Sequence, residues 1–244
     1  MGIFDFFKSG SPEEQAAKLK PKITQKYGDP TVRQKAIEQV ADLRCEAGVA
    51  VLLHRFVVTV DPQTTDAEEK ERTFKLIVDH GDLALTPIHD FLKRTDHASS
   101  WALKLLLALK TEAQVVDDAV ALLTLWGAEY TRDPEKKIVL IQFLERKDPA
   151  IVGATLTTFL DDVSDEVRLA ALHALSTVPF EPARERILSL LTAGDTAKRV
   201  QAAALNTVCE LGLPVQGYRE RVEALLVDPW FIDRSGNVKK RGAA

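Results

Sequence analysis

The sequence has little of what marks secreted and membrane proteins. Among 244 residues there are two cysteines, Cys45 and Cys209, and their wide separation matches no metal-binding or redox spacing. We interpret both as reduced, partly buried thiols of a cytoplasmic protein, because disulfides persist mainly in oxidising compartments. No apolar run approaches the roughly eighteen residues that a membrane span requires. The sequence therefore predicts no membrane-spanning segment.

The amino terminus also lacks the features of a targeting segment. The opening sequence MGIFDFFKSG has no cationic start, no apolar stretch of adequate length and no small-residue cleavage site. Phe6 stands where an N-myristoylation motif has Ser or Thr, which makes Gly2 a poor acceptor. We therefore expect a cytoplasmic protein without a leader or lipid anchor.

Positive charge is not in excess. Lys and Arg number 32 against 36 Asp and Glu, which gives a formal net charge of -4 at pH 7. Proteins that bind nucleic acid through their overall electrostatic field carry net positive charge. The composition as a whole therefore does not favour that class, and a nucleic-acid site would have to come from a local basic cluster.

Motifs of catalysis and metal binding are absent too. No two of the five histidines have the i, i+4 spacing of a helical metal pair, and there is no His-Glu-x-x-His run. His80, His89 and His97 lie near several aspartates around one predicted hairpin, which leaves a chance metal site as a minor alternative. The glycines are scattered, no Gly-x-Ser-x-Gly occurs, and neither cysteine has a catalytic context. We predict no catalytic residue, metal or cofactor, and no enzyme.

What the sequence does contain is a repeated pair of short amphipathic helices, clearest in Ser164–Leu191. Ser164 is a favourable N-cap, because its side-chain oxygen can accept from backbone N–H groups that the first turn leaves unpaired. Pro179 and Pro182 end the first helix and favour the start of a second. Neither helix can bury its apolar stripe alone, so the unit must stack on copies of itself.

Equivalent positions recur along the chain. Candidate helix N-caps are Asp29, Thr65, Asp96, Asp133, Ser164 and Asp195. Thr65-Asp66-Ala67-Glu68 is a capping box, and Asp148-Pro149 places a capping carboxylate before a proline at a first helical position. The residues 23 positions after the first five caps are Leu52, Ile88, Ala119, Leu156 and Ile187, and those 27 positions after them are Phe56, Leu92, Leu123, Leu160 and Leu191. The sixth unit reaches Val222 and Leu226 four residues late, after the loop around Pro214. This periodicity predicts about six units, starting near 29, 65, 96, 133, 164 and 195.

The pattern resembles HEAT repeats, most clearly in DPTVRQKAIEQVADL (29–43) and SDEVRLAALHALSTV (164–178). The resemblance implies an all-α fold, a right-handed α-α superhelix of about six stacked helix pairs that presents surfaces to other macromolecules. The family's Arg position is matched by Arg33, Arg168 and Arg199, with Lys137 in the fourth unit. A cation in a helix's first turn opposes the macrodipole and needs an acceptor. We expect these four to form a structural ladder with capping or loop carboxylates of neighbouring units.

The repeats occupy residues 29–227, between an amino-terminal cap at 1–28 and a tail at 228–244. The apolar residues Ile3, Phe4, Phe6 and Phe7 either cover the end of the solenoid or dock on a partner or a membrane surface. Ser11-Pro12-Glu13-Glu14 is a capping box that opens a helix to about Tyr27, kinked or split at Pro21. The tail is expected to form a small hairpin turning at Ser235-Gly236, with Trp230 or Phe231 closing the last unit and a basic tip at 239–241.

Three insertions are candidates for specificity, since extra length in a regular array often maps to function. Val57–Thr64 could extend as a short strand, and a third insertion surrounds Pro214. The second brings together Trp126, Tyr130 and Arg132, residue types that are enriched at interface hot spots. The competing interpretation is that Trp126 and Tyr130 only cover the join between two units. The favoured function is a non-enzymatic scaffold or adaptor that binds a protein partner.

The alternative is nucleic-acid binding through a carboxyl-terminal basic cluster. Some HEAT-like proteins are alkylpurine DNA glycosylases that cradle DNA on a basic face. The candidate cluster here consists of Arg184, Arg186, Lys198, Arg199, Arg219 and Arg221. Glu185, Glu220 and Glu223 interleave with these cations, which is more typical of a solvated, salt-bridged face. Trp101 shares the repeat position of buried aliphatic residues, so we expect it in the core rather than in a base-stacking site.

Overall fold

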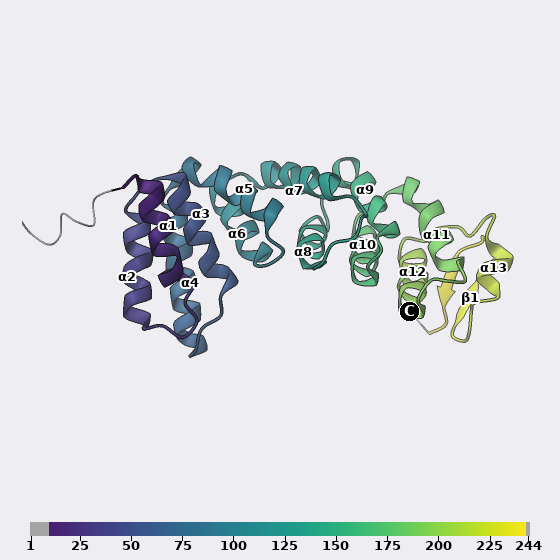
Figure 1. The fold of residues 1–244 in the computed structure, drawn as a ribbon. Helices are drawn as coiled ribbons and strands as arrows, with labels where there is room; N and C mark the ends of the chain where they lie inside the picture. The colour runs from purple at the N-terminus through teal and green to yellow at the C-terminus, as the bar shows by residue number, and fades with distance from the viewer. Residues whose placement is uncertain (1–9, 243–244) are drawn as a thin grey trace, which may run out of the picture. The chain divides into compact units, whose positions relative to one another are not determined.

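The computed structural model describes residues 10–242 and is mostly helical. Within that range are thirteen α-helices, several short 3-10 turns and one two-stranded sheet (Figure 1). The helices are α1 (Pro12–Ile23), α2 (Pro30–Ala41), α3 (Glu46–Leu53), α4 (Gln63–Val78), α5 (Leu85–Arg94), α6 (Ser99–Leu109), α7 (Glu112–Trp126), α8 (Glu135–Phe143), α9 (Pro149–Thr158), α10 (Asp165–Thr177), α11 (Arg184–Thr192), α12 (Lys198–Glu210) and α13 (Arg219–Glu223). The strands are β1 (Trp230–Ile232) and β2 (Val238–Lys240). No helix in the described range is both long enough and apolar enough to cross a bilayer.

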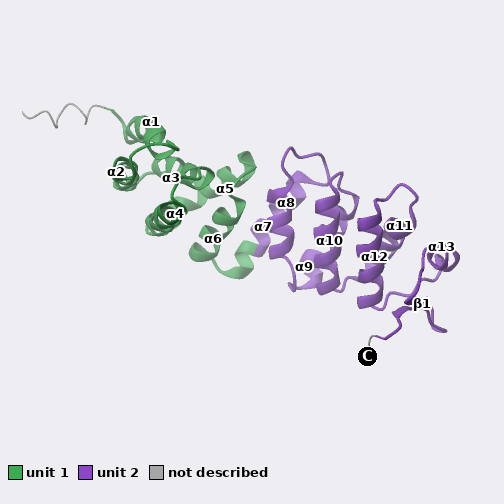
Figure 2. Ribbon diagram, turned by 90° about the horizontal axis from the view of Figure 1, so that it is seen from below, with its two compact units in different colours: residues 1–115 green, residues 116–244 purple. Residues whose placement is uncertain are grey.

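The chain forms two compact units, residues 1–115 and 116–244, whose boundary falls inside α7 (Figure 2). Unit 1 has two layers of helices. In the first layer α3 packs between α1 and α5, and in the second α4 packs between α2 and α6. Contacts of α1 with α2 and of α3 with α2 and α4 join the layers. After α1, each helix of one layer is thus followed by a helix of the other.

Unit 2 repeats this alternation. Helix α10 packs between α8 and α12, while α9 and α11 lie against them from a second layer. Helix α13 is short and contacts α11. From α2 to α13 the chain therefore contains six consecutive helix pairs, whose first helices begin at residues 30, 63, 99, 135, 165 and 198.

The apolar positions predicted from the repeat offsets form the core. All ten residues at the two offsets of the first five units are buried, with relative exposures of 4% or less. In the sixth unit Val222 is fully buried, and Leu226 is half-buried. Burying one aliphatic side chain of this size contributes about 1.5–3 kcal/mol. The second helix of each pair is therefore held mainly by these regularly spaced contacts.

Several predicted helix starts are confirmed by cap geometry. Ser11 accepts a hydrogen bond from the Glu14 backbone N–H at 3.3 Å, and a proline follows it at the first helical position. Asp29 caps α2 by accepting from Thr31 N at 2.8 Å, and Asp148 caps α9 in the same way. Ser164 is the N-cap residue of α10, but its hydroxyl bonds the Glu166 carboxylate instead of the backbone.

Other predicted starts are wrong. Helix α4 begins at Gln63 after Pro62, which puts Thr65 inside the helix and removes the predicted capping box there. Helix α6 begins at Ser99 after Ala98, and α12 at Lys198 after Ala197, so Asp96 and Asp195 are not caps. Asp133 is one residue early, yet its carboxylate still accepts from Glu135 N. In these helix pairs the N-cap residue is proline or alanine. Neither is among the residue types preferred at an N-cap, so the sequence did not indicate these helix starts.

The first helix is shorter than predicted. It ends at Ile23 instead of Tyr27, and Pro21 lies in its last turn without splitting it. Pro21 cannot donate a hydrogen bond to the Ala17 carbonyl, and the helix ends two residues after it. The amino-terminal cluster Ile3, Phe4, Phe6 and Phe7 lies outside the described residues.

The first and third insertions and the tail have distinct structures. The predicted strand at Val57–Thr64 is wrong, since this segment is a 3-10 turn and a loop that leads into α4. The predicted hairpin is present, with β1 and β2 antiparallel and a turn that includes Ser235 and Gly236. The side chain it buries completely is Val238, whereas Trp230 and Phe231 are only half-buried. The Pro214 loop bonds this hairpin, because Val215 N donates to Gly236 O at 2.8 Å.

Candidate functional site

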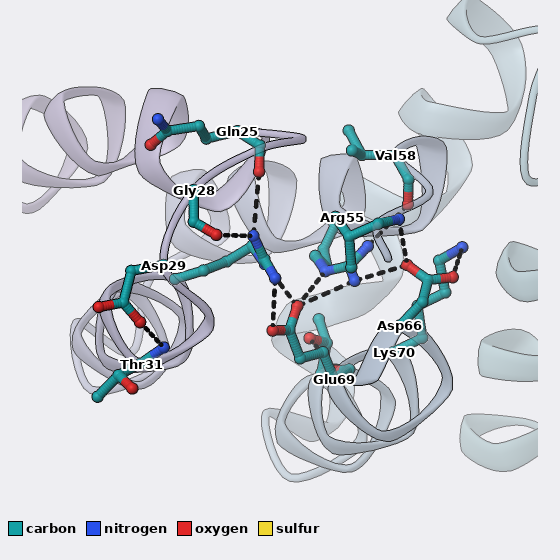
Figure 3. Close-up of polar contacts among 12 residues, drawn as sticks. Gln25, Gly28, Asp29, Thr31, Arg55, Val58, Asp66, Glu69 and Lys70 are labelled. Atoms are coloured by element: carbon teal, nitrogen blue, oxygen red, sulfur yellow. Dashed lines mark hydrogen bonds and ion pairs between the residues drawn. The ribbon is translucent and has the colours of Figure 1, made fainter. Parts of the chain in front are cut away.

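In unit 1 the first ladder residue, Arg33, lies in a buried cluster of charges (Figure 3). Its guanidinium binds the Glu69 carboxylate of α4 in a bidentate manner, with Nε and Nη2 at 2.6 and 2.9 Å from the two oxygens. It also donates to the Gln25 and Gly28 carbonyls. Arg33 thus joins the end of α1 to the first turns of α4. Its partner is a helix side chain, not the capping or loop carboxylate that the pattern predicted.

The same cluster contains a second buried arginine, Arg55, which the pattern did not indicate. Arg55 Nε donates to Glu69 at 2.9 Å, and its Nη2 donates to Asp66 at 2.7 Å (Figure 3). Lys70 binds the other Asp66 oxygen at 2.7 Å. Three cations therefore share two carboxylates in a site from which water is largely excluded. The one sequence signal for this cluster is that Arg55, Asp66 and Glu69 flank the Val57–Thr64 insertion.

Asp66 and Arg55 fix that insertion. Arg55 Nη1 donates to Val58 O at 2.7 Å, and Asp66 accepts from Val60 N at 3.1 Å. Burial opposes ionisation of Asp66, but hydrogen bonds from Lys70, Arg55 and Val60 outweigh it and hold its pKa below the usual value. The carboxylate is therefore charged at neutral pH. Its role is to hold the loop that enters α4.

In unit 2 the ladder residue Lys137 is also buried and paired. Its ammonium lies 2.7 Å from Asp162 Oδ2, in the loop before α10, and it also donates to the Glu129 carbonyl. Asp162 accepts a further bond from Ser164 N at 2.9 Å. One lysine thereby ties the loop between α7 and α8 to the loop between the 3-10 turn η4 (Phe159–Asp161) and α10. This contact agrees with the loop-carboxylate partner expected for the ladder.

The last two ladder residues lie nearer the solvent. Arg168 binds Asp165 of its own helix, and Arg199 reaches back from α12 to Asp165 and Glu166, at 3.2 and 2.8 Å. Side-chain exposure is 22% for Arg168 and 53% for Arg199, against 1% for Arg33 and 0% for Lys137. The ladder residue is therefore buried in two of the helix pairs, where it joins separate elements. In two other helix pairs it is partly or largely exposed to solvent.

The predicted basic cluster is mostly occupied by partners within unit 2. Arg184 is only 15% exposed and donates to the Pro214 and Gln216 carbonyls at 2.8 and 2.6 Å. This holds the Pro214 loop, a structural role that differs from the partner contact expected of Arg184. Arg186 pairs with Asp161, and Arg219 pairs with Glu223 at 2.8 Å.

Two members of this cluster have no carboxylate partner among residues 10–242: Lys198, which donates to Gln201 Oε1 at 3.1 Å, and Arg221. Arg221 stacks over the Tyr218 ring, 4.4 Å from its centroid. Tyr218 in turn bonds Glu185 and Ser189 through its hydroxyl. Most cations of the cluster thus have partners within unit 2, so the cluster is not a stripe of free cations.

The second insertion divides into a buried and an exposed part. Trp126, the last residue of α7, is half-buried, and the Lys136 ammonium lies 5.0 Å from its ring centroid. Tyr130 is 76% exposed. Arg132 is exposed and makes no hydrogen bond or ion pair with any residue of the described chain. Trp126 is therefore partly covered, whereas Tyr130 and Arg132 are exposed to solvent.

Two aliphatic side chains are exposed beside these residues. Leu125 precedes Trp126 and is 67% exposed, and Val163 is 62% exposed. Val163 follows Asp162 directly, and Tyr130 follows Glu129, so both flank the two groups that Lys137 holds together. We call Leu125, Tyr130, Arg132 and Val163 the Tyr130 surface. Tyr130, Arg132 and Val163 stand on two loops fixed by one buried lysine, and Leu125 lies in the last turn of α7.

Comparison with known proteins adds little to this geometry. No family model matches the chain, and no curated protein matches it. The crystal structure of an engineered protein is similar with a TM-score of 0.36 and 17% identity, over 87% of this chain and 89% of that one. Such a similarity assigns neither a fold nor a function. The function must be argued from the surfaces themselves.

Proposed function

We propose that this chain is a non-enzymatic adaptor of the HEAT-repeat type that binds a protein partner in the cytoplasm, and that the Tyr130 surface contacts that partner. The repeat assignment is supported by six consecutive helix pairs and by the burial of every core position predicted for the first five. A right-handed superhelix of these pairs is the architecture that the resemblance implies. Such arrays bind by extended, distributed contacts.

The observation that carries this proposal is an exposed tyrosine and a free arginine on a fixed loop. Tyrosine and arginine are enriched at binding hot spots, because each combines a large contact area with directional polar groups. Ordering a loop on binding costs free energy, typically about 0.5–1.5 kcal/mol for each immobilised side chain. Lys137 already holds the loop through Glu129 O. Less of that cost remains to be met when a partner binds.

Nucleic-acid binding receives less support. A phosphate-binding surface needs cations that can exchange counterions for phosphates. Here Arg186, Arg199 and Arg219 each have a carboxylate at ion-pair distance, and Arg184 is committed to backbone carbonyls. A phosphate would have to displace those partners. The exposed apolar side chains of Leu125 and Val163 favour a protein-binding surface instead.

The test is affinity capture from native lysate, with and without nuclease, using the wild type and Tyr130→Ala/Arg132→Ala. A suitable control is Tyr27→Ala, since Tyr27 is 86% exposed in unit 1 and lies outside the proposed surface. We expect a stoichiometric protein that survives nuclease, that the control retains and that the double variant loses. Recovery of nucleic acid that is lost with Arg219→Glu/Arg221→Glu and in 200 mM salt would overturn the proposal.

A further inference from the structure

Unit 1 contains a groove of about 490 Å³ between α3 and α5, which we call the His54 groove. Its floor is apolar, with Leu53 from α3 and Pro87 and Phe91 from α5. Ala47 and Ala50 line it from α3, and their small side chains leave the space that larger residues would fill. The volume lies within the roughly 300–1,000 Å³ typical of ligand sites. It accommodates a few apolar side chains of a bound segment.

The two helices that form the groove run in the same direction. Arg44, just before α3, donates to Asp79 O at 3.0 Å, just before the turn that leads into α5. At the other end Arg55, just after α3, binds Asp66 and Glu69 in the first turns of α4. Helix α3 is therefore antiparallel to α4, and α5 follows α4 after a short turn. The starts of α3 and α5 form one end of the groove and their carboxyl ends form the other.

The two ends of the groove carry charges of different sign. Glu46 lines the end where the helices start. His54 and Arg94 line the opposite end, and Lys20 reaches it from α1, with its Nζ 2.9 Å from His54 Nε2. Asp90 also lines the groove, 3.6 Å from Arg94, and both of these side chains are largely exposed.

The Lys20–His54 contact leaves a positive charge without a counterion. Partial burial, and then the charge of Lys20, hold the pKa of His54 below its usual value, so the imidazole is neutral and its Nε2 accepts from the ammonium. No carboxylate of residues 10–242 lies within ion-pair distance of Lys20. This end of the groove is therefore complementary to a carboxylate.

We propose that the His54 groove binds an acidic amphipathic segment of a partner protein, with apolar side chains on the Leu53–Phe91 floor and a carboxylate at Lys20 and Arg94. A helix or extended segment laid in a groove recognises its target by such spaced anchors. The carboxylates of Glu46 and Asp90 oppose a continuous phosphate backbone, which favours a peptide over nucleic acid. The proposal stands on unit 1 alone and does not depend on the Tyr130 surface.

The test is fluorescence anisotropy of the full chain with two labelled synthetic peptides of about twelve residues. Both carry leucines at helical spacing; one ends in three glutamates and the other in three lysines. We expect the acidic peptide to bind at least tenfold more tightly. Arg94→Glu should reverse this preference, and Ala50→Trp should abolish binding of both by filling the groove. Lys93→Glu, an exposed cation beside Arg94 but not in the groove, should change binding less than twofold.

Equal binding of both peptides, or no binding at millimolar concentration, would overturn the proposal. So would concentration-dependent self-association that Ala50→Trp abolishes, because the occupant would then be a second copy. Binding of the acidic peptide that persists in Ala50→Trp would place the anion site outside the groove and would also overturn the proposal. These readouts do not use Tyr130, so failure here is distinguishable from failure of the proposed adaptor function.

Discussion

Units 1 and 2 both bury a cation at the same repeat position, but they surround it differently. In unit 1, Arg33 belongs to a cluster of three cations and two carboxylates that spans α2, α4 and the loop between α3 and α4. In unit 2, Lys137 has one carboxylate and one carbonyl. The unit 1 cluster holds helices and an entering loop, whereas the unit 2 pair holds two loops that carry an exposed surface. The same pattern position thus supports the scaffold in one unit and presents a candidate site in the other.

Burial decides what each charge contributes. Removing one partner of a buried pair leaves the other desolvated and unpaired, which typically costs about 3–5 kcal/mol. Exposed pairs contribute about 0–1 kcal/mol, because water competes and side-chain entropy is lost. The repeat pattern alone therefore does not give the energetic role of a ladder cation. That role depends on how much of the neighbouring helices covers it.

The largest effect is expected for Glu69→Ala in unit 1. This change leaves Arg33 and Arg55 buried without their shared carboxylate, and the loss should be about 4 kcal/mol, in the range for broken buried ion pairs. Urea unfolding followed by circular dichroism measures it. Glu68→Ala is the matched control, since Glu68 is exposed on the same helix. An equal shift in the two variants would show that the cluster contributes nothing specific.

A smaller loss, about 3 kcal/mol, is expected for Lys137→Met, because Asp162 keeps its bond from Ser164 N. Its second consequence distinguishes unit 2 from unit 1: the loop at 127–134 should exchange its amide hydrogens faster, since Glu129 O loses its donor. Hydrogen exchange measured by mass spectrometry tests this. Lys198→Met, at an exposed cation of α12, is the control. Unchanged exchange at 127–134 would separate the Tyr130 surface from the buried pair.

Much of the fold follows from the sequence because it depends on local pattern. The offsets of 23 and 27 residues located the buried face of every second helix, since a helical stripe must be covered wherever it occurs. The caps at Ser11, Asp29 and Asp148, and the tail hairpin, likewise depend on residues close in sequence. The HEAT assignment and its superhelix stay predictions.

The site was less predictable because it depends on pairs distant in sequence. Glu69 is 36 residues from Arg33, and nothing local shows that both are covered. The sequence around Arg184 is typical of a surface cation, but the Pro214 loop folds onto this side chain. The His54 groove arises from alanines that look unremarkable in an apolar helix. Tyr130 and Arg132 were identified from residue type alone, and the structure adds their exposure and the anchoring of their loop.

Acid should weaken unit 1 through Asp66. The pKa of this carboxyl is lower in the folded chain than in the unfolded one, so its stabilisation is complete above the unfolded pKa of about 4 and is lost as pH falls through the folded pKa. We expect unfolding free energy to fall less steeply between pH 5 and 2 in Asp66→Asn than in the wild type. Asp61→Asn, at an exposed aspartate of the same loop, is the control. Equal slopes in Asp66→Asn and the wild type would show that Asp66 is not a main source of the acid sensitivity.

The smallest effect is expected for Arg199→Ala, although Arg199 occupies the same repeat position as Arg33. Arg199 and its partner Glu166 are each 53% exposed, so the urea midpoint should hardly change, and any change should vanish in 1 M salt, where the screening length is about 3 Å. The pKa of Asp165 is held low first by its hydrogen bond from Arg168 and less by Arg199. An NMR titration should therefore show a smaller rise of that pKa in Arg199→Ala than in Arg168→Ala. A loss of stability comparable to Glu69→Ala would mean that the repeat position, and not its burial, sets the contribution of these cations, and the contrast between the two units would fail.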